Sequence, residues 1–464
     1  MHLNTQPPNK WMQKRKYTFI AFSIQIIIIG MEYSLTFLTL WLYIKEMMNT
    51  KTPKLFYSLV SVSYMLTSSI LTPFIGRFVD RNRNVSICFL ICNMLMFIGN
   101  IFYSLPFSPY FLIGGRVIAG FGGTLKSVIV SETIRSYPAS EISSKLSILS
   151  VMKNLGYMVA PGINFFFKGV NFSIGRWHLK DLNFPGFFMG LICVIMEVVT
   201  ITMVHNLSKE FDYKALEDKN EADVIEIEVS KIEKDKKPPI LQNNDNENSV
   251  LIVTPKEHTV VNILKKLFFH IDSALILFSS FFLAFFLVNT DIWLPLLVIE
   301  KMHLSITEMN ISFLGSGVFC ALSLLLFMWK PLTDKKMILL LLIGLGCFCI
   351  ISAGFVILSL YPFNKALNVV FCVVYMIGFG VAPIITDVFL INALAKMVNS
   401  NVLTFVDGIR SSMFFGGAFL AFASSAFLFD YVEIFGTAFV VVMILIGIFF
   451  SIRKSNLLYP ELLL

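Results

Sequence analysis

Charged residues are scarce in this chain: Asp, Glu, Lys and Arg make up only 14% of its 464 residues. A soluble protein of this length carries about a quarter charged residues. Its core could also not bury an apolar content of 56%. The composition therefore predicts an integral membrane protein that crosses the bilayer many times.

Histidine and cysteine are also few, at six and seven residues. The cysteines all lie in apolar stretches and show no metal-ligand spacing with histidine. The sequence contains no phosphate-binding loop, nucleophile elbow or His/Glu metal motif. We therefore expect no enzyme activity, no cofactor, no metal site and no ATP-driven transport. The net charge of +7 follows the membrane topology and does not indicate nucleic-acid binding.

Twelve apolar segments are long enough to cross a hydrocarbon core of about 30 Å as helices. A charged, aromatic-poor stretch divides them six and six, and we expect it to be largely disordered. The predicted order is a tail (1–16), a six-helix half (17–205), this central loop (206–266), a second six-helix half (267–452) and a tail (453–464). The predicted spans are 17–41, 56–75, 85–104, 110–133, 146–167, 184–205, 267–290, 311–329, 337–360, 367–387, 402–429 and 432–452.

The distribution of Lys and Arg predicts the orientation of the chain. Outside the spans, most of these cations fall on the side that both tails share with the central loop. Cytoplasmic loops carry an excess of Lys and Arg, because these residues resist translocation. Both termini are therefore expected in the cytosol.

A short basic stretch follows the second span and reads Gly76-Arg-Phe-Val-Asp80-Arg81-Asn-Arg83. With six-plus-six spans, it resembles the major facilitator superfamily, whose loop motif is Gly-x-x-x-Asp-Arg-x-Gly-Arg-Arg/Lys. Gly76, Asp80 and Arg81 match this motif. Arg83 stands at its second Gly, which predicts looser packing of this turn against the other half.

Two further motifs carry the same resemblance. Arg116-Val-Ile-Ala-Gly120 fits the Arg-x-x-x-Gly pattern of the fourth span, and a Gly-rich run ending at Pro161-Gly162 fits the fifth. The resemblance implies an all-α membrane protein with twelve transmembrane helices in two six-helix halves, the major facilitator fold. The chain also resembles a lysosomal branch of this superfamily, the ceroid-lipofuscinosis-associated, domain-containing protein 8 type.

The resemblance implies gating roles for Gly76, Asp80, Arg81 and Pro161. Asp80 is expected to cap a neighbouring helix start or to pair with a cation across the interface between the halves. The alternative is that Asp80 only offsets Arg77 and Arg81. Pro161 removes a backbone hydrogen bond and is expected to kink or loosen its span.

Ionisable residues inside the spans are candidates for the functional site, because charges at membrane depth are costly. Glu32 in the first span and Arg116 in the fourth both fall in the non-cytosolic half of the bilayer. We expect them to pair or to share a substrate or a proton, with Glu32 as the candidate for proton coupling. The alternative is a static pair that fixes packing.

A second set of charged residues lies at other depths. Lys126 and Lys153 lie in the fourth and fifth spans, where they either face the interior or snorkel to the interface. Asp407 and Arg410 share one helical face of the eleventh span and can pair with each other. Asp387, at the end of the tenth span, is a third member of this group, whereas Asp291 is expected at the interface.

Three peptide signals and one sequon bear on localisation. The carboxyl tail contains Tyr459-Pro-Glu-Leu462, and the central loop contains Glu247-Asn-Ser-Val-Leu251-Ile252. Both resemble signals that sorting adaptors bind, as does Tyr213-Lys-Ala-Leu216. They predict a lysosomal or endosomal membrane, with the plasma membrane as the alternative. Asn171 is the expected glycosylation site on the non-cytosolic side.

Three functions remain open from the sequence. The first is a secondary active transporter that binds a small anionic or zwitterionic solute near Glu32, Arg116, Arg410, Asp407 and Lys126 in the lipid membrane. The second is an anion channel on the same fold, because the buried cations suit a channel as well as a transporter. The third is a non-transporting membrane protein whose central loop recruits partners.

Overall fold

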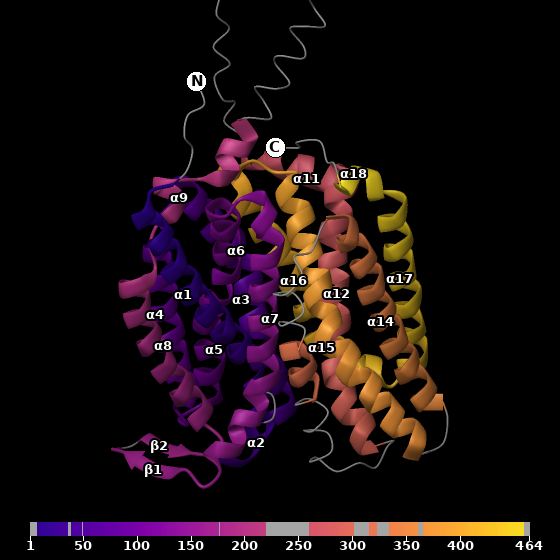
Figure 1. The fold of residues 1–464 in the computed structure, drawn as a ribbon. Coiled ribbons are helices and arrows are strands. Elements are labelled where there is room, and N and C mark those ends of the chain that lie inside the picture. The colour runs from indigo at the N-terminus through magenta and orange to yellow at the C-terminus, as the bar shows by residue number, and fades with distance from the viewer. Residues whose placement is uncertain are drawn as a thin grey trace, which may run out of the picture.

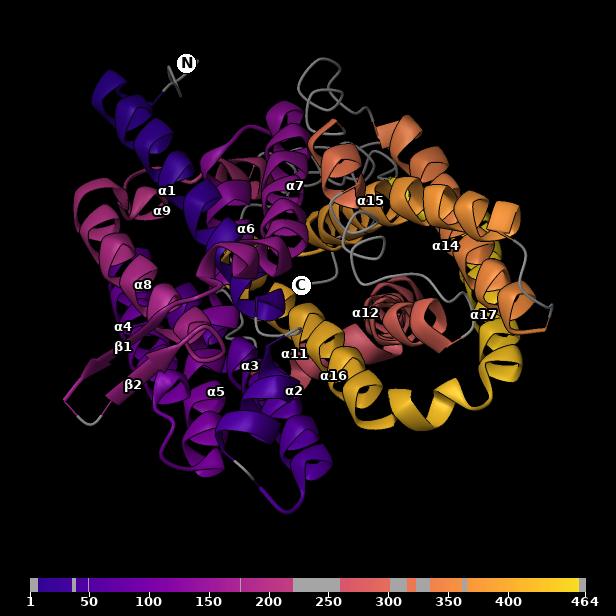
Figure 2. The same cartoon turned by 90° about the horizontal axis from the view of Figure 1, so that it is seen from below.

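The computed structural model describes residues 7–35, 39–48, 50–175, 177–219, 259–300, 315–322, 334–360 and 365–458. Long helices stand side by side in two groups, one built from residues up to 219 and one from residue 259 onward (Figures 1 and 2). The start of α1, helices α9 and α11 and the end of α17 all lie at one end of the bundle (Figure 1). We call this end the terminal face.

The first group contains helices of very different length and a further helical segment at 213–219. The helices are α1 (Asn9–Ser34), α2 (Leu40–Leu42), α3 (Pro53–Asn82), α4 (Val85–Ser104), α5 (Pro109–Gly123), α6 (Leu125–Ser136), α7 (Ala139–Ile163), α8 (Phe184–Met203) and α9 (Leu207–Glu210). A π-helical turn, Tyr43–Met47, and a 3-10 turn, Asn164–Phe167, extend α2 and α7. A hairpin of β1 (Asn171–Ile174) and β2 (Trp177–Lys180) precedes α8.

The second group is also built of helices. Its helices are α11 (Val260–Phe269), α12 (Ile271–Glu300), α14 (Asp334–Leu360), α15 (Lys365–Lys396), α16 (Leu403–Phe429), α17 (Val432–Ile452) and α18 (Lys454–Leu458). A 3-10 turn, Ser400–Val402, leads into α16.

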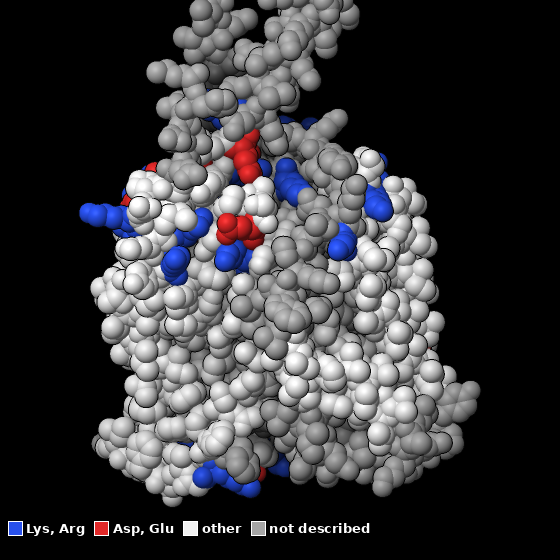
Figure 3. Space-filling model, viewed as in Figure 1, with Lys and Arg blue, Asp and Glu red and all other residues white. Residues whose placement is uncertain are grey.

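The structure confirms the predicted all-α membrane fold. Ten described helices are long and apolar enough to cross a membrane, and α16 covers an eleventh predicted span although it carries Asp407 and Arg410. Of the expected span 311–329, the structure describes only residues 315–322, and these are helical. The face shown in Figure 3 carries Lys, Arg, Asp and Glu at its two ends, and the described residues between them are uncharged.

Several helix ends differ from the sequence prediction: α1 ends at Ser34 instead of 41, and α15 continues to Lys396, nine residues past the predicted span. The expected basic turn at Gly76–Arg83 is mostly helical, because α3 continues seven residues past the predicted span and stops only at Asn82. Likewise α12 continues to Glu300 and leaves Asp291 inside the helix rather than at its end. Polar residues at the end of an apolar run can prolong a helix, so an apolar count underestimates its length.

The ends of the expected central loop are ordered where the structure describes them. Residues 207–210 and 213–219 are helical, and so is α11 at the other end. Trp11 holds the first of these segments: its indole N–H donates to the Leu207 carbonyl at 3.2 Å, and its ring packs edge-on against Phe211. Burial of these aromatic rings explains why a segment with many charges folds here.

Candidate functional site

A cavity of about 90 Å³ lies between the two groups of helices. Its wall is largely apolar and aromatic and includes Tyr33, Tyr64, Phe379 and Phe414. Five charged residues line it as well: Lys126, Lys153, Asp291, Asp387 and Arg410. A mostly apolar cavity with a few convergent polar groups is the usual form of a small-molecule site.

Three cations converge on one carboxylate in this cavity. From the first group, Lys126 Nζ lies 2.9 Å and Lys153 Nζ lies 3.2 Å from Asp387 Oδ2. From the second group, Arg410 Nη1 lies 3.2 Å from Asp387 Oδ1, and its Nε lies 2.7 Å from Asp407 Oδ1. We call these five residues the cation cluster. With three cations and two carboxylates, it carries one net positive charge.

The cation cluster also contains an unused donor. Arg410 is completely buried, yet its Nη2 has no hydrogen-bond partner among the described residues. A buried guanidinium nitrogen without an acceptor is costly, and an anionic oxygen in the cavity would satisfy it. The lysines also lie close to one aromatic ring, at 5.2 and 5.4 Å from the centre of Phe414.

Asp291 is the second acidic residue in the cavity wall, and its expected interfacial position is wrong. The Tyr157 hydroxyl donates a hydrogen bond to its Oδ2, so Asp291 joins α12 to α7 of the other group. The prediction failed because it ended the seventh span at residue 290, ten residues before the end of α12. The cavity therefore has a carboxyl group that contacts a tyrosine, apart from the cation cluster.

Glu32 and Arg116 form the expected ion pair, but away from the cavity wall. Arg116 Nη1 lies 2.5 Å from Glu32 Oε1, and Asn100 donates to Glu32 Oε2 at 2.8 Å. The Arg116 guanidinium also lies 4.8 Å from the centre of the Tyr64 ring, which does line the cavity. The site that the sequence predicts around Glu32, Arg116 and Arg410 thus separates into two places.

We expect Arg116→Ala to destabilise the protein strongly. It would leave the Glu32 carboxylate, which is 1% exposed, without its counter-charge, and such a loss costs about 3–5 kcal/mol. Thermal unfolding in detergent measures this loss. Lys14→Ala is the matched control, because Lys14 pairs with Glu210 on the surface and should barely matter. An unchanged melting temperature for Arg116→Ala would show that the pair does not stabilise the fold.

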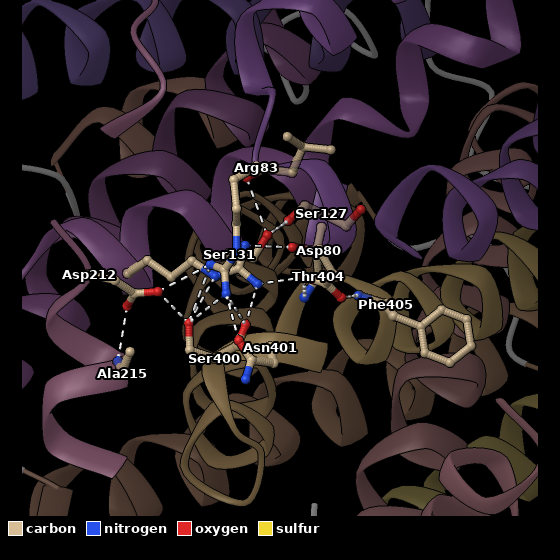
Figure 4. A network of polar contacts seen from close by, with 12 residues as sticks. Asp80, Arg83, Ser127, Ser131, Asp212, Ala215, Ser400, Asn401, Thr404 and Phe405 are labelled. Carbon is tan, nitrogen blue, oxygen red and sulfur yellow. Dashed lines mark hydrogen bonds and ion pairs between the residues drawn. The ribbon is translucent and has the colours of Figure 1, made fainter. Parts of the chain in front are cut away.

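Asp80 joins the two groups of helices at the terminal face (Figure 4). Its carboxylate accepts hydrogen bonds from the backbone N–H groups of Thr404 at 3.0 Å and Phe405 at 2.8 Å, in the first turn of α16. The residue at the N-cap position, Val402, offers no side-chain cap of its own. Asp80 therefore caps a helix of the other half, where the helix dipole also favours a negative charge.

Arg135 completes this contact from α6. Its Nη2 lies 2.5 Å from Asp80 Oδ1, and it donates to Thr404 Oγ1 at 2.8 Å and to Ser400 Oγ at 3.2 Å. Asp80 thus pairs with a buried cation of its own half rather than with Arg77 or Arg81. Of the two expected contacts across the interface, Asp80 makes the helix cap. We call Asp80, Arg135 and their partners in 400–405 the terminal network.

Comparison with known proteins identifies the family. The family model described as Major Facilitator Superfamily matches residues 22–401. The chain belongs to this superfamily. It is therefore a membrane transporter by family, and no curated protein matches it individually.

Solved structures of superfamily transporters share the fold. The human organic anion transporter MFSD10 (TETRAN) superposes with a TM-score of 0.65 at 12% identity, covering 96% of this chain and 99% of that one. The proton:xylose symporter XylE, bound to 6-bromo-6-deoxy-D-glucose, superposes with a TM-score of 0.63 at 10% identity, covering 95% and 96%. At these identities the likeness concerns the fold alone.

Arg83, where the superfamily motif has its second Gly, adapts to that position. Its φ of 52° lies in the left-handed region that favours glycine. Its guanidinium donates to the Ser400 carbonyl and to Asn401 Oδ1, both at 3.2 Å, and lies 3.1 Å from Asp212. The predicted looser packing is wrong, because the long side chain reaches across the interface. Gly76 packs closely too: a Cβ there would lie 2.5 Å from the Thr404 carbonyl oxygen.

The other predicted gating residues take different places. Arg81 is exposed at the end of α3 and is not part of the terminal network. Pro161 lies inside α7, which continues as an α-helix to Ile163 and then tightens into the 3-10 turn. Its role in gating stays a prediction.

The residues predicted for sorting and glycosylation lie at opposite ends of the molecule or outside the residues that the structure describes. Asn171 is exposed in β1, away from the terminal face (Figure 1). Tyr213 is half-buried in a helical segment and packs 4.8 Å from the Phe211 ring, whereas adaptors bind extended peptides. Tyr459, Leu462, Glu247, Leu251 and Ile252 lie outside the described residues.

Proposed function

We propose that this transporter carries a small organic anion, or a zwitterion held by its anionic group, by alternating access. The observation that supports this most is the cation cluster, which places an excess positive charge at a cavity between the halves and includes a buried Arg410 nitrogen with no partner among the described residues. An anionic oxygen would accept from that nitrogen and compete with Asp387 for the lysines. The cluster would then loosen its ion pairs across the interface when the solute binds.

The terminal network supplies the second requirement of alternating access, a closure that can open. Asp80, Arg135 and Arg83 hold the two halves together at the terminal face through α16 and the turn before it. Substrate binding at Arg410 acts on the same helix, only a few residues further along. We infer that movement of α16 links the occupied cavity to the opening of this face.

Proton coupling has two candidate groups. Glu32, which the sequence favours, is held by Arg116 and Asn100 away from the cavity wall. Asp291 lines the cavity and accepts from the Tyr157 hydroxyl, so a proton could reach it from the solute path. We therefore favour Asp291 for any coupled proton and assign Glu32 a packing role.

Reconstitution into proteoliposomes tests the proposal and separates it from the anion channel. A transporter should show saturable uptake of an organic anion that is accelerated when the same anion fills the vesicles. A channel should instead pass current far above alternating-access rates, without this stimulation. Uptake of neutral solutes but of no anion would overturn the assigned substrate class.

We also propose that the terminal face is cytosolic and that the protein resides in a lysosomal or endosomal membrane. The charge bias supports the orientation. The two adaptor-type signals outside the described residues support the location, with the plasma membrane as the alternative. A protein that only recruits partners through its central loop is less well supported, because the charged cavity would then have no role.

Glycosylation tests this orientation. Asn171→Gln is expected to lower the apparent mass by one glycan in a eukaryotic secretory membrane, because β1 exposes Asn171 on the far side from the terminal face. Gel mobility before and after enzymatic deglycosylation measures the change. Asn206→Gln is the control, since the Asn206 sequon lies at the terminal face and should be silent. A glycan lost from Asn206 instead would reverse the orientation.

A further inference from the structure

The β1–β2 hairpin has one apolar and one polar face. Its strands pair antiparallel, and successive side chains of a strand point to opposite faces. The cross-strand pairs on one face are Phe172 with Leu179 and Ile174 with Trp177. The pairs on the other face are Asn171 with Lys180 and Ser173 with His178.

Contacts show which way the apolar face points. The Trp177 indole N–H donates to the carbonyl of Ser104, the last residue of α4, at 2.9 Å, and its ring lies 5.5 Å from Phe187 near the start of α8. The Phe172 ring lies 6.2 Å from Phe184, the first residue of α8. The apolar face is therefore turned toward the ends of two membrane-spanning helices, and the polar face is turned away from them.

Part of this apolar face is left exposed by the residues that the structure describes. Phe172 remains 43% exposed and Ile174 52% exposed. Figures 1 and 2 show the hairpin reaching out beyond α4 and α8 at the end opposite the terminal face. The outer sides of these two helices are also apolar and exposed, at Ile87, Ile91 and Met94 in α4 and at Leu191, Val194, Ile195, Val198 and Ile201 in α8.

We propose that the hairpin is a membrane-surface anchor whose apolar face rests on the lipid bilayer beside α4 and α8. The outer sides of these helices must face lipid in a protein that spans the membrane. The bilayer surface therefore comes level with the helix ends that the hairpin covers. Trp and other aromatic residues concentrate at this depth, because their rings suit the boundary between lipid and water. Phe172 and Ile174 enter the boundary layer, while Ser173 and Lys180 stay in water.

This arrangement fits the sequon on the same hairpin. Asn171 lies on the polar face, so a glycan there would extend into water and not between the hairpin and the lipid. The anchor would fix the start of α8 relative to the membrane surface. It is independent of the proposed solute and of the proposed transport mechanism.

Site-directed spin labelling tests the anchor in the full-length protein. The three half-buried native cysteines, Cys347, Cys349 and Cys372, are replaced, and the other four are buried. A nitroxide is attached at Ile174→Cys or at the adjacent Ser173→Cys on the opposite face. The labelled proteins are reconstituted in phosphatidylcholine vesicles containing phosphatidylglycerol. Collision with oxygen, which concentrates in lipid, is compared with collision with a water-soluble nickel chelate.

The expected oxygen-to-nickel ratio is several-fold higher at position 174 than at position 173. A label at Phe172→Cys should follow position 174, because both side chains lie on one face. Equal, high nickel accessibility at 173 and 174 would overturn the proposal, since the hairpin would then stand in water. Low accessibility of position 174 to both reagents would also overturn it, because a protein surface would then cover the apolar face.

Discussion

Replacing Arg410 by Ala should lower the affinity for the transported anion by about ten- to a hundredfold. A charge-assisted hydrogen bond to a buried charge contributes roughly 1.5–3 kcal/mol, and each 1.4 kcal/mol changes affinity about tenfold. The change also removes the cation that holds Asp387 and Asp407, so the cluster goes from one net positive to net neutral charge. Concentration-dependent uptake into proteoliposomes measures the effect as a rise in KM.

Two further variants serve as comparisons for Arg410→Ala. Arg410→Lys keeps the charge but not the fork of the guanidinium, and it should retain part of the affinity. Arg453→Gln removes an arginine that also pairs with an aspartate. Its partner is Asp272, and the pair lies near the terminal face, far from the cavity lining. The Arg453→Gln variant should leave KM unchanged. An Arg410→Ala protein with the wild-type KM would show that the anion binds elsewhere.

Asp80→Asn should shift the protein toward a state that is open at the terminal face. Removing the charge weakens the cap on α16 and leaves the Arg135 guanidinium, which is 0% exposed, without its counter-charge. The two hydrogen bonds of the cap cross the interface, and a hydrogen bond to a charged group contributes about 1.5–3 kcal/mol, so weakening them can change a two-state ratio about a hundredfold. Spin labels at Lys10→Cys and Lys454→Cys report this as a longer distance between the halves across the terminal face.

Glu210→Gln is the control for Asp80→Asn. It also neutralises a carboxylate at the terminal face, but this carboxylate pairs with exposed Lys14 within the same half. The distance distribution between the two labels should stay as in the wild type. If Asp80→Asn gave the same distribution as well, the terminal network would not hold this face closed.

One helix connects the two predictions. Asp80 caps α16 at Thr404 and Phe405, and Arg410 follows one and a half turns later on the same helix, about 7.5 Å along its axis. A helix moves nearly as a rigid rod over this length. A ligand that displaces Arg410 should therefore change the geometry of the cap. Conversely, loss of the cap should allow Arg410 to move.

The sequence predicted the membrane fold and most spans because lipid imposes long apolar helices. It also singled out Glu32, Arg116 and Arg410 as candidate site residues, because an ionisable residue inside a membrane span is rare. It could not show that Lys126 and Lys153 meet Asp387, since that depends on how helices from two halves face each other. For the same reason, the sequence could not show that Glu32 lies away from the cavity wall.

Residues near helix ends were harder to place. Arg135 looks like an ordinary loop cation in the sequence, yet it is buried against Asp80. Asp291 looks interfacial, yet α12 continues for nine residues beyond it. In both cases hydropathy ends the span where polar residues begin, while the helix and its burial continue. The Asp80 motif pointed to the right region, but only the structure shows that its partner is the start of α16.

An anion bound at the cation cluster should change how the two halves meet. The most direct measurement compares the distance distribution between labels at positions 10 and 454 with and without a saturating transported anion. We predict that the anion redistributes the distances in the wild type and leaves Arg410→Ala unchanged. An unchanged distribution in the wild type, under conditions where that anion is taken up, would contradict the account.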